Sequence, residues 1–281
     1  MKTIDFHTHA FPDQLAGNAL DQLHTNSGDY LAYHNGTVQG LLQSMDRAGI
    51  EKSVVVSIAT KPKQVERITD WAISIRSDRI IPFPSIHPLF SNFESELDRI
   101  KSAGLQGIKL HPMYQEFMID DPTLLPLYRA IANRGLICLF HAGWDIAYPE
   151  SDQAAPHRIL NLHQAIPELK IVAAHLGGWQ VWGEVARHLL GRPIYLETSF
   201  SIREANTSEF RQILDNHPPE YFLFGTDSPW LDQKEELDAW KALDIPVEFK
   251  EKILFKNAER LLKNSYFATK TLRKLREEEK A

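Results

Sequence analysis

Two histidines near the start of the chain, His7 and His9, are spaced so that both could bind one metal ion. They lie two residues apart in a run typical of a β-strand, and residues i and i+2 of a strand point to the same face. With an imidazole from His141 and a carboxylate from Asp227, they would supply three nitrogen ligands and one oxygen ligand. Such a set suits Zn²⁺ or another borderline divalent ion. A lone His-x-His pair is weak evidence, so the prediction requires a fold that brings the four residues together.

His175 is a fifth residue that could take part in the same chemistry. A divalent ion lowers the pKa of bound water toward about 7, and a neighbouring carboxylate or imidazole can accept the released proton. We expect His175 either to be a further ligand or to orient or protonate the group that the metal activates.

Short apolar runs alternate with stretches that carry apolar residues at helical spacing, which indicates βα units and a parallel sheet. The eight predicted strands are Thr3–His9, Ser53–Ile58, Ile80–Ile86, Gly107–His111, Leu136–His141, Ile171–His175, Ile194–Thr198 and Tyr221–Asp227. The predicted helices are Val38–Ala48, Gln64–Arg76, Phe93–Ala103, Leu124–Asn133, His157–Ile166, Trp182–Leu190, Ser208–Asp215 and Pro246–Leu262.

This pattern favours a closed (β/α)8 barrel, because an open doubly wound sheet usually stops near about six strands and has a glycine-rich turn after the first. We expect residues 1–281 to form a single TIM-barrel domain of the α/β class. Ala10–Thr37 is a short insertion after the first strand, with a length typical of segments that cover a site. Pro246–Leu262 is a C-terminal helix that closes the barrel, and the charged tail Thr271–Ala281 is a solvated or frayed helix end.

The barrel would gather many of the histidines at one end. Of the 12 histidines, six lie at the carboxyl ends of predicted strands: His7, His9, His87, His111, His141 and His175. Asp227 ends the eighth predicted strand. In a (β/α)8 barrel these strand ends meet at one mouth, where the active sites of the fold are built.

The composition is that of an ordinary globular protein, with 43% hydrophobic and 24% charged residues. A net charge of -6 offers no basic field to a phosphate backbone, so we expect no nucleic-acid partner. No stretch reaches the ~18 apolar residues of a membrane span. The single cysteine, Cys138, lies in an apolar run and cannot form an internal disulfide. We therefore expect a cytoplasmic protein, away from membranes, that acts on a small molecule.

Six motifs follow one another between residues 4 and 262. They are Ile4-Asp5-Phe6-His7-Thr8-His9, Gly107-Ile108-Lys109-Leu110-His111-Pro112, Phe140-His141-Ala142-Gly143, Ala174-His175-Leu176-Gly177-Gly178, Phe224-Gly225-Thr226-Asp227-Ser228-Pro229 and Asn257-Ala258-Glu259-Arg260-Leu261-Leu262. With these motifs, in this order, the chain resembles the amidohydrolase superfamily, in particular the amidohydrolase-related branch of metal-dependent hydrolases and non-oxidative decarboxylases.

The resemblance implies roles for individual residues. It implies that His7, His9, His141 and Asp227 hold a divalent metal, usually zinc and sometimes manganese, with one ion per chain commoner than two. It also implies that His175 is a catalytic histidine beside the ligands and that Asp227 shuttles a proton. A homodimer is the default assembly in this branch.

Lys109 is open to several interpretations. On the fourth strand it should share a face with His111, which would place it in the barrel interior. In binuclear members of the superfamily a lysine on this strand is carboxylated and bridges two metals, and His175 would then bind the second ion. Lys109 could instead anchor an anionic substrate or form a structural ion pair, and we favour these two roles over the carbamate.

Candidates for substrate contact lie just beyond the strand ends. Aromatic side chains there could sandwich a planar ring, and Arg203 could bind a carboxylate through two hydrogen bonds. Each could alternatively pack a lid or form a surface pair. The candidates are His111, Tyr114, Trp144, Trp179, Arg203 and Trp230.

Two reactions fit the predicted ligands. In a hydrolase, metal-activated water, deprotonated by Asp227 or His175, attacks the carbonyl of a small anionic or cyclic ester, lactone or amide. In a carboxy-lyase, the metal chelates the carboxylate of an aromatic or unsaturated substrate, and CO2 leaves as the carbon is protonated. The sequence favours the hydrolase, because the chain is compact and decarboxylases of this branch commonly carry longer insertions. A metal-binding protein without turnover is the third hypothesis, disfavoured because structural zinc sites are closed by four protein ligands.

Overall fold

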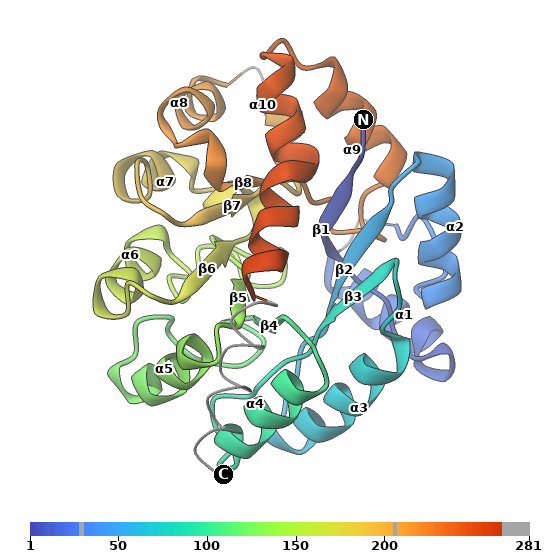
Figure 1. Ribbon diagram of the computed structural model, residues 1–281, viewed down its shortest axis with the longest axis vertical. Helices are drawn as coiled ribbons and strands as arrows, with labels where there is room; N and C mark the ends of the chain where they lie inside the picture. Colours follow the sequence, from blue (N-terminus) through green and yellow to red (C-terminus); the bar gives the residue numbers. More distant parts are fainter. Residues whose placement is uncertain (28–30, 205–206, 266–281) are drawn as a thin grey trace, which may run out of the picture.

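Eight parallel strands and the helices around them make up the computed structural model, which describes residues 1–27, 31–204 and 207–265 (Figure 1). The strands are β1 (Ile4–Thr8), β2 (Lys52–Val56), β3 (Ile80–Phe83), β4 (Gly107–Leu110), β5 (Ile137–Phe140), β6 (Lys170–Ala173), β7 (Tyr195–Glu197) and β8 (Phe222–Leu223). Every predicted strand is present. Each ends before its predicted last residue, because the backbone leaves the hydrogen-bonded ladder where the loops of the mouth begin.

The strands follow one another around a barrel in the order of the chain. β1 to β3 form one parallel sheet and β4 to β8 another. The backbone N–H of Lys109 donates to the carbonyl of Pro84 at 2.8 Å, which links β4 to the end of β3. On the opposite side, the N–H of Asp227 donates to the carbonyl of His7 at 2.7 Å, which holds the segment after β8 beside β1. The arrangement is the predicted TIM barrel.

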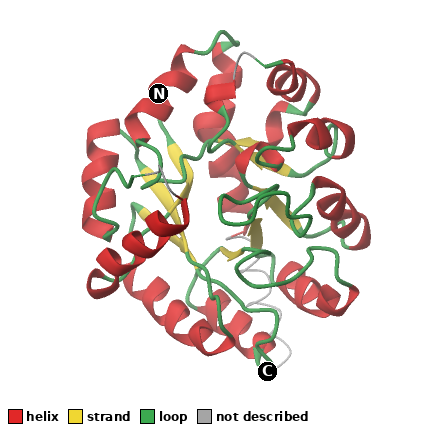
Figure 2. Ribbon diagram, turned by 180° about the vertical axis from the view of Figure 1, so that it is seen from behind, coloured by secondary structure: helices red, strands yellow, loops and turns green. Residues whose placement is uncertain are grey.

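Helices cover the outside of the barrel (Figure 2). They are α1 (Asp13–Ser27), α2 (Val38–Ala48), α3 (Val65–Ile75), α4 (Phe93–Ser102), α5 (Leu125–Asn133), α6 (Pro156–Ala165), α7 (Trp182–His188), α8 (Ser208–Asn216), α9 (Gln233–Ala242) and α10 (Val247–Glu251). The sequence-based prediction lacks α1 and α9. Helix α1 lies inside the predicted insertion Ala10–Thr37, and α9 buries only two large apolar side chains, Leu237 and Trp240, too few to show a helical period.

The C-terminal helix closes one end of the barrel, as predicted. Helix α10 continues through a π-helical turn, Lys252–Lys256, into helical residues 257–265, and crosses in front of the strands in Figure 1. Ala258 and Leu261 belong to the same buried cluster as Phe6 and Leu139 of the barrel interior. Because this packing fills one end of the barrel, the carboxyl end of the strands is the end left for a site.

Cys138 is a free, buried thiol on β5, in agreement with its apolar surroundings in the sequence. The predicted tail Thr271–Ala281 lies outside the described residues. Among the described residues, no helix combines the length and the apolar character that crossing a membrane requires.

Candidate metal centre

The end of β1 directs two histidines toward the mouth of the barrel. The pairing of β1 with β2 loses its regular register between Asp5 and Thr8. An irregularity of this kind re-aims the side chains beside it. The rings of His7 and His9 lie 5.3 Å apart, centroid to centroid, and both reach the carboxylate of Asp227 after β8. The structure therefore brings together three of the four predicted ligands.

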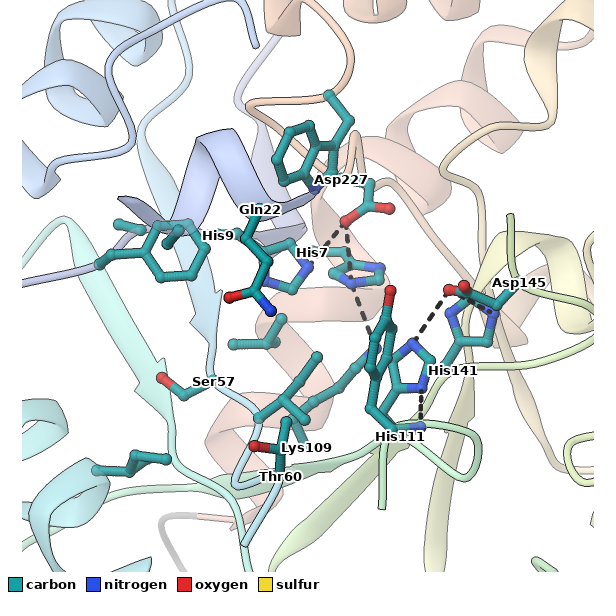
Figure 3. Close-up of a pocket in the computed structure, with 18 of the residues that line it drawn as sticks. His7, His9, Gln22, Ser57, Thr60, Lys109, His111, His141, Asp145 and Asp227 are labelled. Atoms are coloured by element: carbon teal, nitrogen blue, oxygen red, sulfur yellow. Dashed lines mark hydrogen bonds and ion pairs between the residues drawn. The ribbon is translucent and has the colours of Figure 1, made fainter. Parts of the chain in front are cut away.

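The facing atoms of these three residues fit a cation. Asp227 Oδ1 lies 2.9 Å from His9 Nε2 and 3.4 Å from His7 Nε2 (Figure 3). This oxygen is buried and accepts no hydrogen bond from any described residue. A buried carboxylate oxygen without a partner is costly, and a divalent ion shared with the two imidazoles would satisfy it.

The charges of the cluster also favour a cation. Burial lowers the pKa of His7 well below its usual value, so the ring is neutral and its lone pair is available to a metal. Burial acts to raise the pKa of Asp227, but the neighbouring His7 and His9 outweigh it and hold that pKa well below the usual value. At neutral pH an ionised carboxylate thus faces a neutral imidazole.

Glu197, the last residue of β7, sets the tautomer of His7. His7 Nδ1 donates to Glu197 Oε2 at 2.8 Å, which leaves the lone pair on Nε2, the atom that faces Asp227. The backbone N–H of Ser199 donates to Glu197 Oε1 at 2.6 Å and fixes the carboxyl group from its other side. Sequence reasoning missed Glu197. The sequence feature that could have revealed it is an isolated acidic residue in a predicted strand. The other interior position of that strand, Tyr195, carries a largely apolar side chain.

The rings of His141 and His175 are joined by a hydrogen bond, and the other partner of His141 determines which of the two rings donates in it. His141 Nε2 donates to the carbonyl of Trp144 at 2.7 Å, so His141 Nδ1 carries the lone pair. His175 Nε2 therefore donates to His141 Nδ1 at 3.0 Å, and Ser199 Oγ lies 2.9 Å from His175 Nδ1. Both rings are neutral in this chain of bonds. Burial accordingly lowers the pKa of His141 to about 3 and that of His175 well below its usual value.

Ser199 also holds Glu197 through its hydroxyl group, which donates to Glu197 Oε2 at 2.8 Å. Burial nevertheless raises the pKa of Glu197 to about 8.

The predicted ligand His141 lies beside the cluster of His7, His9 and Asp227 rather than within it. The ligand atom of His141 is occupied by His175, and its ring stacks on that of His111 with centroids 4.2 Å apart. His111 Nε2 in turn lies 3.4 Å from Asp145 Oδ2, so these residues form a second group that could hold a cation (Figure 3). A third such group consists of His7, His175 and Glu197. Sequence reasoning missed Asp145, which follows β5 on a loop and has no strand position to reveal it.

Lys109 lies in the barrel interior, as its strand position predicts. Its side chain is fully buried, and its Nζ atom lies 3.3 Å from His7 Nε2. Burial lowers the pKa of Lys109 to about 8. No carboxylate of a described residue forms an ion pair with it, which disfavours the structural ion pair among the predicted roles.

A cavity of about 840 Å³ opens over these residues. It is lined by the histidines of the site and by the predicted substrate contacts His111, Tyr114, Trp179 and Trp230. Trp144 and Arg203 are absent from the described lining residues. Trp144 contributes its backbone carbonyl, which accepts the hydrogen bond from His141. Arg203 is exposed in the 3-10 turn Ile202–Glu204, and Glu236 of α9 is a charged neighbour.

Backbone conformation at the strand ends is unusual for side-chain-bearing residues. His175, Phe200 and Asp227 have φ values of 56°, 57° and 57°. Such left-handed conformations cost of order 1–3 kcal/mol each and cluster at functional sites, where the surrounding structure maintains them. All three residues line the cavity.

Comparison with known proteins gives a family and a fold. A sequence model of the family described as amidohydrolase matches residues 4–263. No curated protein matched the chain. Among solved structures, a TIM-barrel protein from Bordetella bronchiseptica is 22% identical, with a TM-score of 0.73 over 94% of this chain and 99% of that one.

Two further solved structures are decarboxylases with bound manganese. A dihydroxybenzoic acid decarboxylase from Polaromonas is 16% identical, with a TM-score of 0.69. A 5-carboxyvanillate decarboxylase variant from Novosphingobium aromaticivorans is 14% identical, with a TM-score of 0.70. Each alignment covers 93% of this chain and 97% of the other. At these identities the likeness shows a shared fold.

Proposed function

The chain belongs to the amidohydrolase family, and from that premise we propose that it is a metal-dependent enzyme in which His7, His9 and Asp227 hold a divalent ion. The observation that carries this proposal is the buried Asp227 Oδ1, which faces two imidazole nitrogens and accepts no hydrogen bond from the described residues. Bound there, a divalent ion would supply Lewis-acid polarisation of a substrate oxygen. We expect Zn²⁺ or Mn²⁺, and the manganese in the two solved decarboxylases supports the second choice.

For the reaction, we propose decarboxylation of an aromatic or unsaturated carboxylate. Lys109 supports an anionic substrate, because its buried ammonium group lies beside the metal ligands, has no carboxylate partner among the described residues, and would be stabilised by an anion. Aromatic side chains in the cavity, Tyr114, Trp179 and Trp230, suit a planar ring. The solved decarboxylases with this fold support the same choice.

The chain's own residues have separate tasks in this reaction. Lys109 binds the substrate carboxylate, and the aromatic walls hold the ring plane. The bond between the carboxyl carbon and the ring carbon breaks, its electron pair stays on the ring carbon, and CO2 leaves. We assign delivery of the proton to His175, which lines the cavity: its ring takes up a proton from solvent, donates it to the ring carbon as CO2 leaves, and returns to the neutral form.

Hydrolysis of an ester, lactone or amide is the second candidate. The family description supports it, and so does the position of Asp227, whose carboxylate lies beside the imidazoles of His7 and His9 and could accept a proton from water. Compactness of the chain favoured this reaction at the level of sequence. Lys109, which forms no ion pair with a carboxylate of the described residues, now gives the carboxy-lyase priority.

Product analysis separates these reactions. Protein reconstituted with Mn²⁺ or Zn²⁺ would be incubated with hydroxybenzoic acids and, separately, with lactones and aryl esters. We expect CO2 release and, in D2O, one deuterium at the ring carbon that lost the carboxyl group, with neither in an Asp227→Ala variant. Acid release from lactones or esters without CO2 would replace the carboxy-lyase by the hydrolase. A metal-loaded protein inert to both sets would contradict an enzymatic role for the site.

A further inference from the structure

The cavity over the metal centre extends into a second lobe between α1 and α3, two helices that lie next to each other in Figure 1. Its total volume of about 840 Å³ is in the range of pockets for drug-sized ligands, so a one-ring acid would leave much of it unfilled. Spacings of three, four and seven residues place the first set of lining residues on one face of α1, and the second set on one face of α3 and the 3-10 turn Pro62–Gln64 before it. The α1–α3 lobe is lined by Leu15, Ala19 and Gln22 on one side and by Gln64, Arg67, Ile68 and Trp71 on the other.

Arg67 is the one charged side chain among the described residues that line this lobe. It forms no hydrogen bond or ion pair with another described residue. Asp70, one helical turn further along α3, would be its natural partner but is bound by Arg99 of α4. Lys63, exposed in the 3-10 turn Pro62–Gln64 before α3, does not line the cavity. The guanidinium group is thus available to an anion without first breaking an ion pair.

Amide groups accompany Arg67 in the lobe. Gln64 Oε1 accepts hydrogen bonds from the N–H of Lys61 at 2.9 Å and from the hydroxyl of Thr60 at 3.1 Å. These bonds fix the carboxamide and leave its NH2 group without a partner among described residues. In Figure 3, Gln22 and Thr60 lie on one side of the cluster of His7, His9 and Asp227, and Asp145 lies on the other. Asp145 is the acidic residue of the cavity nearest His111. No carboxylate of a described residue lines the lobe itself.

We propose that the α1–α3 lobe binds a second carboxylate, at the far end of an elongated substrate whose first carboxylate lies at the metal centre. Leu15, Ile68 and Trp71 would contact an apolar or aromatic middle section, and Arg67 would bind the distal carboxylate through two hydrogen bonds. This inference rests on the proposed function, because the metal centre defines the first end of the substrate. It makes Arg67 a residue that determines specificity rather than one that takes part in the chemical step.

Binding measurements with metal-directed probes test the lobe separately from the reaction. The probes are phenylhydroxamic acids, whose hydroxamate chelates divalent ions, with a para-alkyl tail of graded length that ends in either a carboxylate or its neutral primary amide. Dissociation constants are measured by calorimetry on protein loaded with Mn²⁺ or Zn²⁺. At the tail length that reaches Arg67, we expect the carboxylate to bind about tenfold to fiftyfold more tightly than the amide. This gain should shrink as ionic strength rises.

Two variants complete the test. Arg67→Ala should abolish the difference between carboxylate and amide tails while the parent hydroxamate binds unchanged. Lys63→Ala, which removes the same charge from the 3-10 turn before α3 and outside the cavity, should keep the difference. The parent hydroxamate could bind while a carboxylate tail gives no gain in affinity, or while that gain persists in Arg67→Ala. Either result would refute the proposed role of the lobe without contradicting the metal centre. A parent hydroxamate that fails to bind the metal-loaded protein would refute the metal centre and the lobe together.

Discussion

At the scale of single residues, the carboxyl group of Glu197 controls which nitrogen of His7 can bind a metal ion. It accepts a hydrogen bond from His7 Nδ1 and is itself held by the backbone N–H of Ser199 on Oε1. A metal-binding histidine whose other nitrogen donates to such a partner is fixed in tautomer and orientation. Glu197 is thus a positioning residue for the candidate ligand.

We predict that Glu197→Gln lowers metal affinity about tenfold to a hundredfold, although glutamine has the same shape. Ser199 N–H requires an oxygen at the Oε1 position, so the amide NH2 would face His7 Nδ1 and donate to it. His7 would then carry its proton on Nε2, the atom required for the metal. Competition with a chelator of known affinity measures the change.

The matched control for this prediction is Glu96→Gln, which alters a buried glutamate on α4 that pairs with Arg99, neither of which lines the cavity. It should leave metal affinity unchanged. Glu197→Gln protein that binds metal as tightly as the unmodified chain would contradict the assigned role.

The sequence predicts some of these residues and not others for physical reasons. His7 and His9 follow from the period of a strand, and Asp227 from its place at the end of the last strand, because a parallel barrel gathers strand ends. The contact of Glu197 with His7 joins residues 190 positions apart, and no local pattern records it. Arg203 has a suitable residue type, but its side chain is exposed. The strand ends predict where the mouth lies, but they do not predict the direction in which each loop residue points.

At the scale of elements, α9 carries a buried acid that its sequence pattern does not explain. Glu236 is 4% exposed, and its Oε2 atom has no hydrogen bond with a described residue. Burial raises its pKa from 4.5 to about 7. Arg203 opposes this shift, and Asp5, Glu235 and Glu197 add to it. The packing of α9 on the barrel therefore includes an ionisable group that is easier to bury when protonated.

We predict that Glu236→Gln stabilises the fold at alkaline pH. A carboxyl group whose pKa is higher in the folded than in the unfolded state contributes stability below its unfolded value of 4.5, and that stability is lost as pH rises through about 7. Glutamine never ionises, so the variant should have a free energy of unfolding about 1–3 kcal/mol higher than the parent near pH 8. This gain should shrink as pH falls toward 4.5.

Urea unfolding across this pH range, with a chelator present so that metal release does not contribute, measures the effect. Glu235→Gln, at an exposed neighbouring position of α9, is the control and should show no such trend. A Glu236→Gln variant whose stability runs parallel to that of the parent at every pH would show that the carboxyl group is not perturbed in the folded protein.

The two helices that sequence reasoning missed illustrate what periodicity can detect. Helix α2 buries Leu41 and Met45 on one face and begins at Thr37, whose hydroxyl accepts from the N–H of Gly40, so its pattern was readable. Helix α9 places Gln233 and Glu236 on its buried face, which hides the apolar period. Helix α1 lines the cavity with part of its surface. Residues that line a cavity match the ligand they contact, so they need not show the apolar period of a helix packed on the core.

At the scale of the whole molecule, the barrel has one filled end and one open end. The helix at residues 257–265 packs under the barrel interior, while α1 and α3 wall a cavity over the carboxyl ends of the strands. The order of the eight strands could be predicted, because alternating βα units leave few other topologies. The shape of the cavity could not, since it depends on loop directions and on a helix hidden in the predicted insertion.

The central claim is that His7, His9 and Asp227 form a metal centre, and the metal content of the protein tests it most directly. The chain, purified without added metal or chelator, and its Asp227→Ala variant would be analysed side by side, with circular dichroism as the control for folding. We predict about one equivalent of Zn²⁺ or Mn²⁺ per chain, lost in the variant while the fold is retained; about two equivalents would instead favour a carboxylated Lys109. Equal metal content in both proteins, or none in either after incubation with Zn²⁺ and Mn²⁺, would contradict the claim.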